Sequence, residues 1–159
     1  MPTTDSQRGL VEDELVDRRS NRLARALLRL AVGPGDGVGV LVCDQHAVDL
    51  LVARHAIAKI GGRRIGDDAG FESREASLSA HRVAAECPLA ILACAEGVEA
   101  LRKTRVHSRV IGDGEGVYWW RAIEGLESPA PLTADEIYSS SSRCRDTSMV
   151  SGRFDSNVA

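Results

Sequence analysis

What the sequence lacks narrows its function before any motif is considered. The 159 residues carry 20 basic and 23 acidic side chains, a formal net charge of −3. The chain therefore lacks the positive excess that binds a nucleic-acid backbone or an anionic membrane surface. It also has no apolar run of the roughly 18 residues that a transmembrane segment needs, and its N-terminal residues lack the basic and apolar regions of a leader peptide. We predict a cytoplasmic protein that binds no nucleic acid and has no transmembrane segment.

The cysteines and histidines of the sequence also lack the spacing that is typical of metal ligands. No two cysteines form a CxxC pair, and His46 and His55, nine residues apart on one predicted helix, should point to opposite sides. We therefore predict no metal site. In a reducing compartment, unpaired cysteines mostly behave as small buried apolar side chains, and we expect this of all four. They are Cys43, Cys87, Cys94 and Cys144.

Lysine is scarce, because the sequence holds 18 arginines but only two lysines, Lys59 and Lys103. Both fall within predicted helices, where we expect solvated surface positions. The preference for arginine is typical of a GC-rich coding sequence and predicts a bacterial source.

Helical and strand patterns alternate along the chain. Apolar residues at spacings of three, four or seven predict helices, whereas "PLAILACA" is apolar without alternation and is typical of a strand buried on both faces. The pattern predicts an α/β fold with a mostly parallel sheet covered by helices and joined by right-handed crossovers. The predicted helices cover residues 12–30, 46–62, 71–86 and 96–105, and the predicted strands 38–43, 63–65, 88–95 and 107–114.

The glycine-rich stretch "AVGPGDGVGVLV" at 31–42 is the first candidate for a phosphate-binding loop. Such a loop follows a strand and opens a helix, whereas this stretch follows a helix and opens a strand. We therefore interpret it as a helix-to-strand turn, with stop signals at Gly33 and Pro34. Asp36 is expected to bond backbone amides within the turn.

Two other pairs of residues carry alternative interpretations. Arg63 and Arg64 interrupt an apolar strand, so the strand is expected to be short or at an edge, with Asp67 or Asp68 as a partner. The alternative is that both arginines bind an anionic ligand near a topological switch point. For Trp119 and Trp120, consecutive side chains diverge, so one ring should be buried and the other available to a protein partner.

The segment Asp13 to Val42, "DELVDRRSNRLARALLRLAVGPGDGVGVLV", resembles the opening of acyl-CoA ligases and other adenylate-forming enzymes of the AMP-binding superfamily. These enzymes have a helix of the type "EL…R.N.LA..L...GV..GD.V.V" before their first core strand. The similarity continues more weakly to Gly112. It implies the N-terminal subdomain of the acyl-CoA ligase fold, in a family that uses ATP and Mg²⁺. Family members are several times longer than this chain.

The resemblance also suggests candidate site residues. The segment "YSSSSRCRDTSMV" from Tyr138 falls where the family has its nucleotide-phosphate loop, "YTSGTTGxPKGV", which implies a degenerate phosphate-binding role for four serines. They are Ser139, Ser140, Ser141 and Ser142. Two loop glycines are replaced by Ser141 and Cys144, and the loop lysine by Thr147, so the backbone freedom and the positive charge that the loop needs are reduced.

These observations divide the chain into a flexible N-terminus (1–11), an α/β ligase-like subdomain (12–125), and a linker with a poorly ordered serine-rich tail (126–159). We predict a truncated acyl-CoA-ligase-like protein that lacks acyl-adenylation activity alone, with no catalytic residues and no cofactor bound by the isolated chain. One alternative is a regulatory module that forms a homo-oligomer or pairs with a ligase-like protein. Another is one subunit of a split acyl-CoA synthetase, and a frameshifted remnant would give the same sequence.

Overall fold

The sheet consists of five parallel strands in the order β2-β1-β3-β4-β5. The computed structural model describes residues 4–113 and 118–139. In the register of the central strands, Leu41 lies beside Ala93, and Ala93 beside Gly112. The predicted α/β fold with a parallel sheet is confirmed. The strands are β1 (Gly37–Leu41), β2 (Arg63–Ile65), β3 (Ala90–Ala93), β4 (Arg109–Gly112) and β5 (Tyr118–Trp119).

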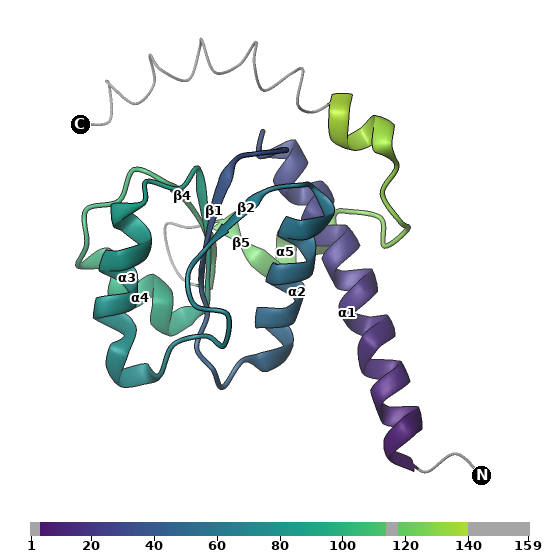
Figure 1. Cartoon of the computed structure of the whole chain (residues 1–159), viewed down its shortest axis with the longest axis horizontal. Helices are drawn as coiled ribbons and strands as arrows, with labels where there is room; N and C mark the ends of the chain where they lie inside the picture. The colour runs from purple at the N-terminus through teal and green to yellow at the C-terminus, as the bar shows by residue number, and fades with distance from the viewer. Residues whose placement is uncertain (1–3, 114–117, 140–159) are drawn as a thin grey trace.

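Helices cover both faces of this sheet. Helices α3 and α4 lie on one face, and α1, α2 and α5 lie on the other (Figure 1). The chain passes through α2 to the edge strand β2 and returns through α3, on the opposite face, to β3. The direction of winding therefore reverses between β1 and β3, which makes their carboxyl ends a topological switch point. The helices are α1 (Thr4–Arg29), α2 (Ala47–Lys59), the 3₁₀ turn η1 (Ser73–Glu75), α3 (Ala76–Ala85), α4 (Ala95–Arg102) and α5 (Trp120–Gly125).

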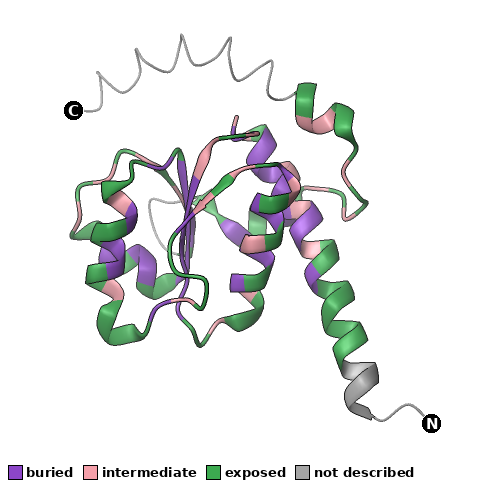
Figure 2. Ribbon diagram, viewed as in Figure 1, coloured by how far each residue is buried: buried purple, intermediate pink, exposed green. Residues whose placement is uncertain are grey.

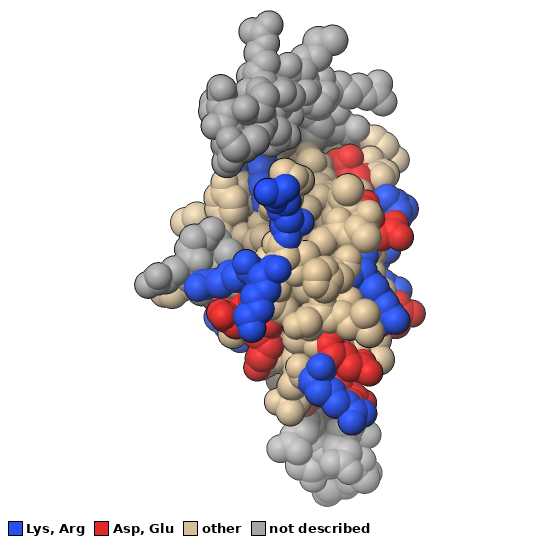
Figure 3. Space-filling view, turned by 90° about the vertical axis from the view of Figure 1, so that its left-hand side faces the viewer, with Lys and Arg blue, Asp and Glu red and all other residues tan. Residues whose placement is uncertain are grey.

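The core lies on both faces of the two central strands. All four residues of β3 are buried, as are the last four residues of β1 (Figure 2). Continuous apolar burial is the reason these short segments form interior strands of a parallel sheet. Around the side that carries α3 and α4, acidic and basic side chains lie interspersed at the margins of an uncharged area (Figure 3). Within the described ranges, no helix combines the length and the apolar character needed to cross a bilayer.

The start of α1 differs from the sequence prediction, because the helix begins at Thr4 rather than at Glu12. Its end at Arg29 agrees with the prediction within one residue. There Ala31 takes a left-handed backbone with φ 65°, and the Val32 amide donates to the Leu27 carbonyl at 2.9 Å. This is a helix C-cap of the type that usually uses glycine, formed here by alanine.

The turn after α1 has the geometry that the sequence predicts. The Asp36 carboxylate accepts a hydrogen bond from the Gly33 amide at 2.8 Å. Gly35 has a φ of 82°, a left-handed conformation that side-chain-bearing residues rarely adopt. The glycine-rich stretch therefore joins α1 to β1 as a structural turn.

The prediction that Lys59 is a solvated surface residue is wrong. Its ammonium group lies between α2 and α1 and donates to Asp17 Oδ1 at 2.8 Å, Ser20 Oγ at 2.7 Å and Asn21 Oδ1 at 2.7 Å. Ser20 and Asn21 are themselves buried, so the ammonium group supplies partners to polar groups that water does not reach. Lys59 thus fastens the end of α2 to the middle of α1.

Helix α5 is fastened to α1 by a second buried polar group, the Glu124 carboxylate. Trp120 donates its indole N–H to Glu124 at 2.6 Å, and Arg19 of α1 donates to the same carboxylate at 3.1 Å. Burial lowers the pKa of Arg19, but its contacts with Glu124 and Asp49 raise the pKa overall, so the guanidinium is firmly charged.

The prediction that one tryptophan ring is buried and the other exposed is confirmed, since Trp120 is buried and Trp119 is 65% exposed.

Candidate functional site

Of the four serines proposed for a phosphate loop, Ser139 is the one that the structure describes. It ends a short helical segment, 134–139, and is exposed. Ser140, Ser141 and Ser142 lie outside the described residues, as does Cys144. The serine site therefore stays a prediction, and the part of it that the structure shows is the surface around Ser139.

Ser139 borders a broad groove between α1, β4 and the segment 126–139. The groove encloses about 1040 Å³, and three arginines line it, Arg25, Arg29 and Arg109. Three positive charges beside a serine are the kind of group that could bind phosphate oxygens. Whether they can do so depends on what already pairs with them.

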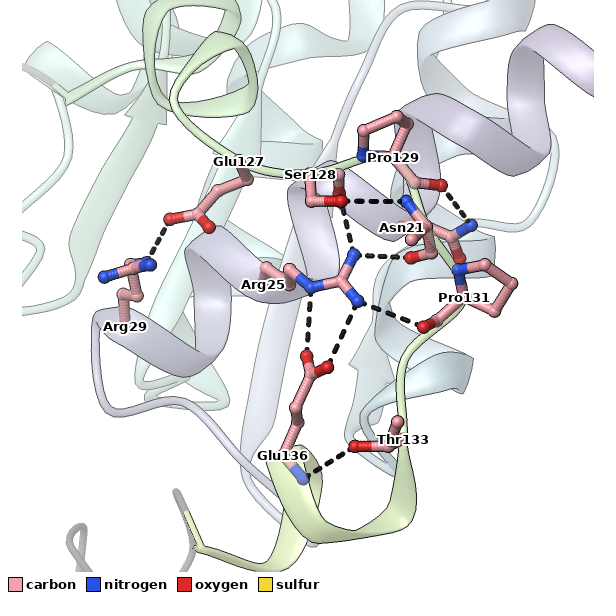
Figure 4. A network of polar contacts seen from close by, with 10 residues as sticks. Asn21, Arg25, Arg29, Glu127, Ser128, Pro129, Pro131, Thr133 and Glu136 are labelled. Atoms are coloured by element: carbon pink, nitrogen blue, oxygen red, sulfur yellow. Dashed lines mark hydrogen bonds and ion pairs between the residues drawn. The ribbon is translucent and has the colours of Figure 1, made fainter.

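Each of these arginines is already engaged within the chain, and Figure 4 shows the contacts of Arg25 and Arg29. Arg25 donates to the Glu136 carboxylate through Nε at 2.9 Å and through Nη2 at 3.2 Å. Arg29 forms an ion pair with Glu127. Arg109 donates to the Leu30 carbonyl at 2.6 Å. The carboxylates of Glu127 and Glu136 offset most of the positive charge, so the groove is a poor anion site in this arrangement.

The same contacts explain what the arginines do instead. Arg25 also donates to the backbone carbonyls of Ser128 at 2.7 Å and Pro131 at 3.0 Å, and Asn21 donates to the Pro129 carbonyl at 2.9 Å (Figure 4). Prolines and turns leave such carbonyls without partners in regular structure, and one guanidinium can serve several of them. Arg25 and Asn21 therefore hold the first part of the segment after Gly125 against α1.

The structure decides between the two interpretations of Arg63 and Arg64. As expected, they lie on a three-residue edge strand, and Arg64 pairs with Asp68. Arg63 lies beside Gly37, at the amino end of β1. The switch point is at the opposite, carboxyl end of the strands, so the alternative of an anion site there is wrong.

Residues that the sequence prediction did not connect meet at the switch point. His46 precedes α2 after β1, and Cys94 precedes α4 directly after β3. Their side chains and the carboxylate of Glu96 form one group in which each ligand atom lies within 4.8 Å of the others. The signal that could have found them is topological, because parallel strands bring their carboxyl ends to one edge of the sheet.

The prediction that the cysteines are buried apolar side chains is confirmed for Cys43 and Cys94, but it is wrong for Cys87, which is exposed.

No family model matches the sequence, and no curated protein does. Solved structures do match the fold. A benzoate CoA ligase from Burkholderia xenovorans superposes with a TM-score of 0.57 at 17% identity, over 75% of this chain and 24% of the ligase. A long-chain-fatty-acid-CoA ligase from Archaeoglobus fulgidus gives a TM-score of 0.54 at 18% identity, over 72% of this chain and 23% of the ligase.

A third solved structure also matches the fold at low sequence identity and over part of its own length. The inhibitor-bound N-terminal domain of FACL13 from Mycobacterium tuberculosis gives a TM-score of 0.57 at 15% identity, over 76% of this chain and 30% of that one. The expected resemblance to acyl-CoA ligases is thus confirmed at the level of the fold. This chain has the fold of a part of acyl- and aryl-CoA ligases and spans about a quarter of the length of the ligases it matches.

Proposed function

We propose that this chain is a ligase-like scaffold that does not adenylate carboxylates as an isolated polypeptide. The observation that carries the proposal is the fold match, in which three quarters of this chain superposes on about a quarter of a CoA ligase. A shared fold supports a shared ancestry of the scaffold, but activity depends on the groups that the scaffold presents.

The groups that this chain presents fit ATP and Mg²⁺ poorly. Acyl adenylation requires a triphosphate, a metal ion and a carboxylate held in line, with positive charge directed at the reacting phosphorus. In the segment that resembles the phosphate loop, Ser141 and Cys144 stand in place of glycines, and Thr147 stands in place of the lysine. In the described part, the arginines that border Ser139 are paired with carboxylates or carbonyls. We therefore propose no catalytic residue and no nucleotide cofactor for the chain alone.

Carboxylate-dependent exchange between ATP and pyrophosphate tests this proposal. The purified chain is assayed with benzoate and with fatty acids of several lengths, beside a full-length CoA ligase as the positive control. We expect exchange no faster than in samples without carboxylate. Clear exchange by the chain alone would contradict the proposal. Exchange that appears only after a second ligase-like polypeptide is added would instead favour the alternative of a split synthetase.

An interaction module is a second candidate function, and the surface of α1 favours it. Near its N-terminus, α1 extends beyond the other helices (Figure 1), and three of its apolar side chains there are exposed. Leu10 is 70% exposed, Val11 66% and Leu15 48%. Val11 and Leu15 are one helical turn apart, so their side chains form one apolar stripe. An apolar stripe at the end of a helix supports association with a second copy or with a ligase-like partner.

Light scattering during size-exclusion chromatography tests the homo-oligomer form of this candidate. We expect the wild-type chain to associate as its concentration rises, and the double variant Val11→Glu, Leu15→Glu to run as a monomer because charges now occupy the stripe. Leu78→Glu is the matched control, since Leu78 is 50% exposed but lies on α3. A wild-type chain that stays monomeric at high concentration would contradict self-association.

The cytoplasmic location and the bacterial source remain proposals based on composition.

A further inference from the structure

The switch point between β1 and β3 carries a cluster of side chains that the ligase-like function does not use. His46 and Cys94 are the residues that immediately precede α2 and α4, and Glu96 lies in the first turn of α4. These two helices lie on opposite faces of the sheet (Figure 1), so the cluster lies beyond the carboxyl ends of β1 and β3. Open α/β sheets bind their ligands at this position.

The ligand atoms of this cluster have the spacing of a metal site. A ring nitrogen of His46, the sulfur of Cys94 and a carboxylate oxygen of Glu96 lie within 4.8 Å of one another. The closest pair, His46 Nε2 and Glu96 Oε2, is 3.3 Å apart. Bonds of about 2.0 to 2.3 Å at tetrahedral angles place the ligands of a zinc ion about 3.4 Å apart. Small side-chain rotations would therefore bring the three atoms onto one ion.

Cys94 is held in place by the backbone around it. The Cys43 amide donates to Cys94 Sγ at 3.3 Å, and the Gly97 amide is a second donor to this sulfur. A side chain at Gly97 would bring its Cβ to 2.4 Å from the Leu41 carbonyl oxygen, so the first turn of α4 can sit against the end of β1 only with glycine there. Two amides directed at one sulfur fix its position, and they would also stabilise the thiolate, which is the form that binds metal.

Metal binding at the cluster would require the Cys94 thiol to lose its proton. Burial raises the pKa of the Cys94 thiol to about 11, and the thiol hydrogen-bonds the Glu96 carboxylate. A bound metal ion would displace that proton and take the place of this hydrogen bond. The resulting thiolate and carboxylate would together offset the charge of a divalent cation, with neutral histidine as the third ligand.

The cluster is open on the side of the solvent. Cys94 is buried, but the side chains of His46 and Glu96 are 40% and 42% exposed. An ion could therefore enter without unfolding of the chain, and a fourth position would face water. Three protein ligands with one open position are characteristic of reactive zinc sites, whereas structural sites use four.

We propose that His46, Cys94 and Glu96 bind one divalent ion of the zinc class, with water at the fourth position. A mixed set of sulfur, nitrogen and oxygen ligands favours Zn²⁺ over Mg²⁺ or Ca²⁺, which prefer oxygen alone. The sequence prediction of no metal site relied on spacing along the chain, whereas His46 and Glu96 are 50 residues apart and meet through the fold. This inference is independent of the proposed ligase-like function.

Titration of the full metal-free chain with Zn²⁺ and with Co²⁺ tests the site. Calorimetry should show one Zn²⁺ per chain, and Co²⁺ should give the intense near-ultraviolet absorption of a cobalt–thiolate bond. Cys94→Ser should remove this absorption and weaken Zn²⁺ binding about 100-fold, because even outer-shell partners of metal ligands are worth about 10- to 100-fold. His46→Asn and Glu96→Gln should weaken Zn²⁺ binding at least about tenfold. Cys87→Ser is the matched control, because Cys87 is exposed and precedes the amino end of β3, whereas Cys94 follows its carboxyl end. This variant should bind as the wild type does.

Three results would overturn the proposal. The first is no Zn²⁺ binding at micromolar concentrations of chain and metal. The second is a cobalt–thiolate absorption that survives Cys94→Ser but is lost in Cys87→Ser or Cys144→Ser. The third is wild-type affinity in both His46→Asn and Glu96→Gln. These two variants change partly exposed side chains, so they carry the test even if Cys94→Ser does not fold, which circular dichroism would reveal. Neither ATP nor a carboxylate is present, so failure here is distinct from failure of the proposed function.

Discussion

At the scale of single residues, charged side chains mainly link one helix to another through ion pairs and hydrogen bonds. Lys59 joins α2 to α1, Arg19 joins α1 to α5 through Glu124, and Arg25 joins α1 to the segment 126–139. Each side chain reaches groups that are buried or backbone carbonyls that have no partner in regular structure. Removing such a charged group leaves its buried partners without a hydrogen bond. The free-energy cost of these unpaired groups is larger than the net gain from the original bonds. We infer that these residues are retained for structure.

The two lysines allow a matched test of this interpretation. Lys59→Met removes the ammonium group that serves Ser20 and Asn21 and should lower the free energy of unfolding by about 1 to 3 kcal/mol. Lys103→Met changes an exposed side chain and should alter the free energy by no more than about 0.5 kcal/mol. Urea unfolding followed by circular dichroism measures both. Equal stability of the two variants would show that Lys59 is a solvated surface residue after all.

At the scale of elements, the cap of α1 has a local cost that the sequence does not reveal. The helix ends within one residue of the prediction, but the left-handed position falls on Ala31 and not on a glycine. The reason is the packing that follows, because Val32 is fully buried and its amide must reach back to Leu27. A methyl group in the left-handed region costs about 1 to 2 kcal/mol, so this cap stores local strain.

Substitution by glycine should release that strain. Ala31→Gly should raise the free energy of unfolding by up to about 1 kcal/mol, since the gain in backbone geometry exceeds the added entropy of the unfolded chain. Ala58→Gly, at an exposed position inside α2, should lower it by about 1 kcal/mol. Opposite signs for the two variants in urea unfolding are the expected result. A loss of stability in both would mean that Ala31 carries no strain.

The sequence predicts the regular elements well where a single physical signal dominates. The apolar run around Ile91 leads to β3, and the long segment from His46 to the stop signals at Gly61 and Gly62 leads to α2, both within a few residues. The strand β5 and the helix α5 were not predicted, because two and six residues are too few to show a period. The helical segment 134–139 follows a proline-rich stretch and is held by Arg25, which only tertiary structure reveals.

The candidate metal cluster could not be predicted from spacing for a related reason. His46 and Cys94 belong to different crossovers, and each has an ordinary local role at the start of a helix. Only the strand order, with β3 beside β1, brings them together. The arginines beside Ser139 show the reverse case, in which residues that suggest anion binding are paired with their own carboxylates. Residue type indicates what a site could bind, and the partners decide whether it does.

At the scale of the whole molecule, the chain is an α/β sheet with the topology of a part of CoA ligases and with a long helix fastened to one face. The segment 126–139 is also held against this helix, through the contact of Arg25 with Glu136. Ser139 therefore lies beside three arginines that already have partners within the chain. We propose that this arrangement keeps the ligase scaffold but does not bind a nucleoside triphosphate.

Binding of MgATP to the full chain tests that proposal most directly. Equilibrium dialysis with labelled ATP, at chain concentrations near 100 μM, separates binding from any requirement for an acyl substrate. We expect no saturable binding, and the same result for a variant in which Ser139 to Ser142 are all alanine. Saturable binding by the wild-type chain that disappears in the alanine variant would show a working phosphate loop and would contradict the interpretation of the chain as a scaffold without nucleotide.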